Sequence, residues 1–151
     1  MDWVATQTLD SRLHFHPCGL AGKDGSIVLH APHKTELSYS IVQRENPIGE
    51  SFEVPVKRLA TLMRELNHDH VDILKMDIEG AEYEVIEDML QSGIRPPQVL
   101  IEFHHRFKGI GNEATRDAVR LLRAAGYRIF YVSHTAREYG FILESALAGN
   151  K

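Results

Sequence analysis

The sequence predicts an α/β fold, in which helices cover a sheet with parallel central strands. Candidate strands and helices alternate between residues 59 and 126, and this alternation is typical of parallel sheets. Two candidate strands, 71–76 and 99–103, are nearly continuous in apolar residues, as in strands covered on both faces. At 151 residues the chain is long enough for one domain with its own core. We therefore expect residues 1–151 to form a single domain.

The first half of the chain contains the less regular elements. Apolar and polar residues alternate in three segments, which predicts short strands at Leu13–His16, Ser26–Ala31 and Phe52–Val56. Turn residues at Lys23–Gly25 separate the first two of them. Pro55 indicates that the third strand lies at a sheet edge or ends there. The polar segment Thr35–Gly49 has no clear period and is predicted to be a loop.

The second half is more regular. Apolar side chains recur at helical spacing in three segments, which predicts helices at Leu59–Leu66, Ala81–Gln91 and Asn112–Ala125. Asn112 is the expected N-cap of the last helix, and Gly126 ends it. The stretches YRIFYV (127–132) and EYGFIL (138–143) predict two final strands. Because so few residues separate them, we expect this pair to be antiparallel.

Composition and charge exclude several classes of function. The chain is 43% hydrophobic and 25% charged, as in an ordinary globular protein. Its net charge of −4 offers no broad basic surface, so we expect no nucleic-acid partner. We also expect no membrane partner and a cytoplasmic location, because no apolar run approaches about 20 residues and the first residues lack a signal-peptide pattern. The single cysteine, Cys18, agrees with a reducing compartment.

Acidic and histidine side chains follow two of the predicted buried strands. Asp77 and Glu79 come after the strand at 71–76, and the next strand ends at Glu102, His104 and His105. Ligands of open α/β sheets bind at the carboxyl ends of the strands. If the two strands are neighbours, these five residues converge on one crevice. Because side chains alternate along an extended segment, we expect only one of the two histidines to face it.

The same residues have structural alternatives. Acids ahead of a helix can cap its free N–H groups, and Glu82 stands three residues after Glu79, as a capping box requires. Gly80 can serve a tight turn without any ligand. Asp77 and Glu79 could also hold Mg²⁺ together with oxygens of a substrate. The nine histidines are accompanied by no HExxH or paired CxxC pattern, so no dedicated metal site is predicted.

The run DILKMDIEGAEYEVI (72–86), with FEVPVKRLATLM before it and VLIEFHH after it, resembles the FkbM family of S-adenosylmethionine-dependent methyltransferases. The resemblance covers roughly residues 13–143. It implies a Rossmann-like methyltransferase sheet, mostly parallel, with an antiparallel strand pair at its C-terminal end. It also implies methyl transfer from S-adenosylmethionine to a hydroxyl of a sugar or secondary metabolite.

Methyl transfer from a sulfonium is an in-line displacement, so alignment of the reactants is the enzyme's main task. A hydroxyl acceptor must also lose its proton, and a nearby histidine or carboxylate contributes about 10²- to 10⁴-fold. The candidate residues are Asp77, His104 and His105 for catalysis, Glu79, Glu102 and Arg106 for substrate binding, and Asp77 and Gly80 for cofactor binding. Arg106 would attract an anionic acceptor, although an ordinary charged loop explains it equally well.

One feature of the family is missing. Family members carry a first strand with a glycine-rich acidic turn, and a second strand ending in an acid, upstream of the segment that matches Leu13. Only twelve residues precede Leu13 here, and no GxGxxG or DxGxG pattern occurs. We therefore expect the C-terminal portion of a methyltransferase without its first two strands, with 1–12 as a loosely ordered lead-in. The family strand order, 3-2-1-4-5-7-6, places the gap before the strand at Ile73.

These expectations leave more than one function open. The first is an O-methyltransferase whose cofactor-binding half comes from an upstream companion segment or another chain. The second is a non-catalytic α/β remnant that acts as a binding or assembly module. A hydrolase using the carboxylates of Asp77 and Glu102 is a third. In each case the incomplete sheet would expose strand edges, which favours a homodimer.

Overall fold

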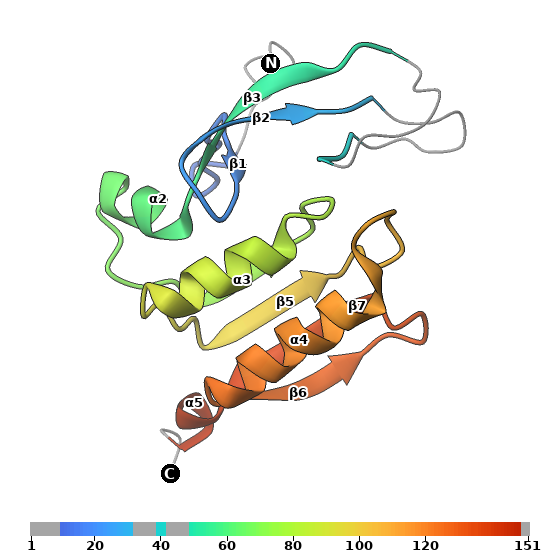
Figure 1. Cartoon of the computed structure of the whole chain (residues 1–151). Helices are drawn as coiled ribbons and strands as arrows, with labels where there is room; N and C mark the ends of the chain where they lie inside the picture. Colours follow the sequence, from blue (N-terminus) through green and yellow to red (C-terminus); the bar gives the residue numbers. More distant parts are fainter. Residues whose placement is uncertain (1–9, 32–38, 42–48, 149–151) are drawn as a thin grey trace.

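The computed structural model describes residues 10–31, 39–41 and 49–148 (Figure 1). The strands are β1 (Gly19–Leu20), β2 (Gly25–Leu29), β3 (Phe52–Lys57), β4 (Ile73–Met76), β5 (Gln98–Glu102), β6 (Tyr127–Val132) and β7 (Glu138–Leu143). The helices are α2 (Leu59–Glu65), α3 (Glu82–Gln91), α4 (Gly111–Ala124) and α5 (Glu144–Ala148). The strands form two mixed sheets, which confirms the α/β prediction and replaces the expected single sheet by two. Most of the predicted loop and lead-in lies outside the described residues.

The larger sheet has the order β4-β5-β7-β6. β4 and β5 are parallel, and β7 is antiparallel to both β5 and β6. The predicted antiparallel pair at the C-terminal end is therefore confirmed. The prediction of a mostly parallel sheet is wrong for the described residues, because β7 returns after a short turn and inserts between β5 and β6. That the sheet is Rossmann-like and lacks its first two strands stays a prediction.

The smaller sheet has the order β1-β3-β2. The strand predicted at Leu13–His16 is wrong, since the first strand is β1 and Leu13 is 59% exposed. Alternation alone does not make a strand when no neighbour offers hydrogen bonds. The edge position predicted from Pro55 is also wrong, because β3 is the central strand. Here β1 pairs only with Val56 and Lys57, so Pro55 has a neighbouring strand on the β2 side alone.

The three main helices agree closely with their predicted ranges, although α4 starts differently. Its N-cap is Ile110 rather than Asn112, and no side-chain cap is present. Gly111, with φ 79°, turns the chain into the helix. At the start of α2, the Asp24 carboxylate accepts hydrogen bonds from Arg58 N and Thr61 Oγ1, each at 2.8 Å. The turn before β2 is thereby joined to α2.

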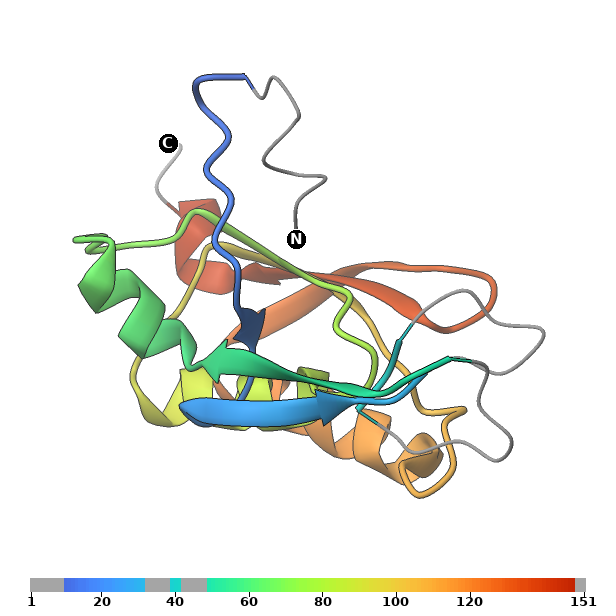
Figure 2. The ribbon, with the colours of Figure 1, turned by 90° about the horizontal axis from the view of Figure 1, so that it is seen from above.

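Helices α3 and α4 lie together on one side of the larger sheet (Figure 2). Beneath them the core is built from alternate strand residues and one helix stripe: Leu74, Met76, Val99, Ile101, Phe141, Val85, Ile86 and Met89. The prediction that β4 is covered on both faces is wrong, because Ile73 is 57% exposed. The carboxyl ends of β4 and β5 are each followed by a loop. In the described part of the chain, none of the helices combines the length and the apolar composition that a membrane-spanning helix needs.

Both edge strands of the larger sheet expose apolar side chains. Ile73 of β4 and the run Ile129–Val132 of β6 are between 38% and 57% exposed. Unpaired edges of this kind favour pairing with another chain. We therefore predict that the chain is dimeric in size-exclusion chromatography with light scattering, and that Ile73→Lys or Tyr131→Lys shifts it toward the monomer. A wild-type chain that stays monomeric at all workable concentrations would contradict the prediction.

Candidate active site

The turn between β4 and α3 places the candidate acids. Asp77 follows the last residue of β4, and Glu79 and Gly80 both have positive φ, at 54° and 111°. A side chain at Gly80 would be strained, and its Cβ would lie 3.3 Å from Ile110 Cδ1. The carbonyl oxygen of Glu79 accepts a hydrogen bond from Ser40 Oγ at 3.0 Å. The turn is thus held tightly, with both carboxylates at the carboxyl end of β4.

Glu82, the first residue of α3, is fully buried beneath this turn. Its Oε1 accepts hydrogen bonds from Ile78 N at 3.1 Å and Gly80 N at 3.2 Å. The capping box predicted for Glu79 is not formed, because the N-cap is Ala81 and has no side-chain cap. Glu82 instead accepts hydrogen bonds from the N–H groups of the turn, and it does so from a buried position beneath them. Glu82 was predicted only as a capping-box residue, although the helix face that it shares with Val85, Ile86 and Met89 indicates burial.

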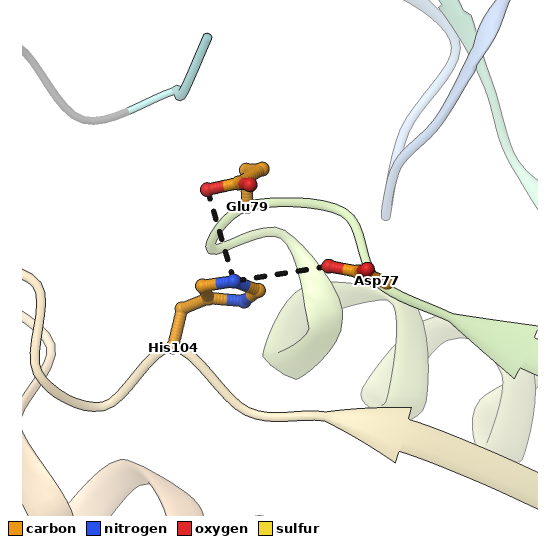
Figure 3. Close-up of side chains that lie close together, drawn as sticks. All are labelled: Asp77, Glu79 and His104. Atoms are coloured by element: carbon orange, nitrogen blue, oxygen red, sulfur yellow. Dashed lines mark ion pairs between the residues drawn. The ribbon is translucent and has the colours of Figure 1, made fainter. Parts of the chain in front are cut away.

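His104 joins the two strand ends. It follows β5, its side chain is only 10% exposed, and its Nδ1 lies 2.8 Å from Glu82 Oε1. Its Nε2 lies 3.8 Å from Asp77 Oδ1 and 3.7 Å from Glu79 Oε2 (Figure 3). Asp77, Glu79 and His104 therefore meet at one point, and each offers a ligand atom within 4.8 Å of the others.

Charge and burial act on His104 in opposite directions. Burial lowers the pKa of His104, but the hydrogen bond to Glu82 and the charges of Glu82, Glu79 and Glu102 outweigh it, so the pKa is raised from its usual value of 6.5. Lys75 lies 3.8 Å from Asp77. The site is consequently an acidic environment in which a positively charged group is favoured.

The remaining candidates lie around this cluster. His105 faces α4, with Nδ1 3.4 Å from Thr115 Oγ1, and burial together with the charges of Arg106 and Arg137 lowers its pKa. A carboxylate oxygen of Glu102 lies 3.8 Å from Arg137 Nη1. Arg106 is exposed. The structure thus brings Asp77, Glu79 and His104 together and leaves Glu102, His105 and Arg106 outside the cluster.

Residues 4–129, well over half of the chain, match the methyltransferase FkbM domain. The chain belongs to the FkbM methyltransferase family. A probable methyltransferase-like protein 24 from Rattus norvegicus is 25% identical over 89 residues. That alignment covers 54% of this chain and 24% of the rat protein, so the chain spans about a quarter of that relative's length. No solved structure matches.

Proposed function

We propose that this chain is the acceptor-side portion of an S-adenosylmethionine-dependent O-methyltransferase that acts on a hydroxyl of a sugar or secondary metabolite. Its membership of the FkbM family supports methyl transfer. The order β4-β5-β7-β6 equals the last four positions of the family's strand order, which supports a Rossmann-like sheet without its first strands. The observation that carries the proposal is the convergence of Asp77, Glu79 and His104 at the carboxyl ends of β4 and β5.

Of the two residues predicted to bind the cofactor, Asp77 fits this role and Gly80 does not. Asp77 is 43% exposed at the end of β4, where its carboxylate can bind an ammonium group or a hydroxyl. Gly80 is packed against Ile110 and Ile41, at 3.3 and 3.4 Å from its would-be Cβ, so its backbone is covered by this chain's own side chains. No GxGxxG or DxGxG pattern occurs in the sequence. The proposal therefore includes a companion segment or chain that binds the nucleotide part of the cofactor.

When bound, S-adenosylmethionine supplies a methyl group on a positively charged sulfur. This chain's contribution is to place the acceptor oxygen and help remove its proton. Asp77 and Glu79 orient the hydroxyl of the acceptor. His104, together with these two acids, helps to remove its proton. His104 serves rather than His105, since His105 faces Thr115 on α4. Loss of one such group lowers the rate by about 10²- to 10⁴-fold.

Methyl transfer tests the proposal directly. The chain is incubated with tritium-labelled S-adenosylmethionine and an extract of its source cells, which supplies acceptors and any companion chain. Label is expected in small hydroxyl compounds, and His104→Asn should reduce it at least about 10²-fold. Asp117→Asn, an exposed change on α4 that loses an ion pair with Arg120, should leave it unchanged. Wild-type transfer by His104→Asn would contradict the role of the cluster, and no transfer at all would favour the binding-module alternative.

A further inference from the structure

Asp77, Glu79 and His104 arrive at one point from three places: the end of β4, the turn into α3 and the loop after β5. The distances from His104 Nε2 to the two carboxylate oxygens, 3.8 and 3.7 Å, are too long for hydrogen bonds. They are close to the separation of ligands that share one ion. We propose that these three side chains bind a divalent transition-metal cation.

The orientation of His104 supports a cation between these groups (Figure 3). Glu82 Oε1 already accepts two backbone N–H groups, so it acts as a carboxylate acceptor toward His104 Nδ1. With Nδ1 as the donor to Glu82, Nε2 is the ring nitrogen that faces Asp77 and Glu79. A divalent ion can take the place of a proton on this nitrogen and bind the two carboxylate oxygens at the same time. A buried carboxylate behind a ligating histidine is the usual supporting arrangement in metal sites.

The ligand set indicates the kind of ion. One imidazole nitrogen with two carboxylates suits Mn²⁺, Fe²⁺ or Zn²⁺ better than Mg²⁺ or Ca²⁺, which prefer oxygen alone. Ligand atoms at about 2.1 Å from one ion lie roughly 3.0 to 3.5 Å apart. The three ligand atoms lie within 4.8 Å of one another, so the carboxylates must move closer together on binding, which the 43% and 24% exposure of Asp77 and Glu79 allows. That exposure also leaves coordination positions open to water or a substrate oxygen.

The charge balance agrees with a bound cation. Asp77, Glu79 and Glu82 bring three carboxylates to the cluster, and Lys75 is the lysine beside them. Lys75 is 67% exposed and lies 3.8 Å from Asp77 Oδ2, whereas His104 lies near the other oxygen, Oδ1. A divalent ion would offset the charge at the point where the three ligand atoms meet.

A cation at this point would also change how the acceptor is activated. A hydroxyl oxygen coordinated to a divalent ion loses its proton more readily, and the ion fixes the oxygen for attack on the methyl group. His104 would then act as a ligand, and the proton would leave to a carboxylate oxygen or to water. This consequence rests on the proposed methyltransferase function, whereas binding of the ion does not.

Electron paramagnetic resonance with Mn²⁺ tests the site without any enzymatic activity. One equivalent of Mn²⁺ should lose its free-ion signal on the wild-type chain, and Zn²⁺ should displace it. Asp77→Asn, Glu79→Gln and His104→Gln should each weaken binding at least tenfold, with circular dichroism confirming that they fold. Asp117→Asn and His70→Gln, which alter exposed groups outside the cluster, should bind like the wild type.

Two results would overturn the cation site. One is a free Mn²⁺ signal that persists with millimolar wild-type protein, while Zn²⁺ also fails to bind. The other is equal binding by the wild type and all three ligand variants, which would place the ion on other histidines. Either result leaves the tritium-transfer test of methyltransferase function unaffected. Conversely, Mn²⁺ binding that depends on the three ligands would stand even if no methyl transfer were found.

Discussion

Glu82→Ala is expected to lower the free energy of unfolding by about 2–4 kcal/mol. The Glu82 side chain is fully buried, and its Oε1 is the acceptor for Ile78 N, Gly80 N and His104 Nδ1. Removing it leaves three donors without a partner beneath the β4–α3 turn. Each buried donor left unsatisfied costs about 1–3 kcal/mol, and loss of the buried charge offsets part of the sum.

Urea denaturation measures this change, with Glu82→Gln and Glu87→Ala as companions. Glu82→Gln keeps an acceptor oxygen, so it should lose about 1 kcal/mol. Glu87→Ala alters an exposed residue of the same helix and should stay within about 0.5 kcal/mol of the wild type. If Glu82→Ala were as stable as Glu87→Ala, Glu82 would not hold the turn in the way described.

Gly80→Ala is expected to destabilise the chain by about 1–3 kcal/mol and to displace the acids beside it. Its φ of 111° is strained for any L side chain. The added Cβ would also lie 3.3 Å from Ile110 Cδ1 and 3.4 Å from Ile41 Cγ1. These side chains must shift, and the turn that carries Asp77 and Glu79 shifts with them.

Gly93→Ala is a matched control for this change. Gly93 also has a positive φ, at 73°, but a Cβ there would meet nothing within 4 Å. Gly93→Ala should therefore lower the free energy of unfolding only by the cost of a positive φ, about 1 kcal/mol, and leave Mn²⁺ binding intact. Equal losses of stability and equal Mn²⁺ affinity in the two variants would show that the packing around Gly80 does not position the acids.

Much of the fold could be predicted from periodicity. The helix stripe Val85, Ile86 and Met89 is regular enough to place α3 within one residue at its N-terminus. The faces of β4 were not predictable in the same way, because an apolar run does not reveal whether a second layer covers it. The first strand was placed wrongly, at Leu13–His16, for a related reason. A strand forms where its backbone can pair with a neighbour, and β3 pairs with Gly19 and Leu20.

The part of the candidate site that lies at the ends of strands was predictable. Asp77, Glu79 and His104 follow two parallel neighbours, β4 and β5, and so arrive at one edge. The choice between His104 and His105 was not predictable, because β5 ends at Glu102 and strict alternation stops there. The burial of Glu82 was indicated by its helix face, but its role was not predictable, because the three donors of its hydrogen bonds are known only from the fold.

Titration calorimetry with S-adenosylmethionine tests most directly whether this chain retains half of a methyltransferase site. The wild-type chain should bind it at millimolar concentration or more tightly, Asp77→Asn should abolish the heat, and Asp117→Asn should retain it. Equal heats from the wild type and Asp77→Asn, or no heat from the wild type at any workable concentration, would contradict a cofactor contact at the carboxyl end of β4.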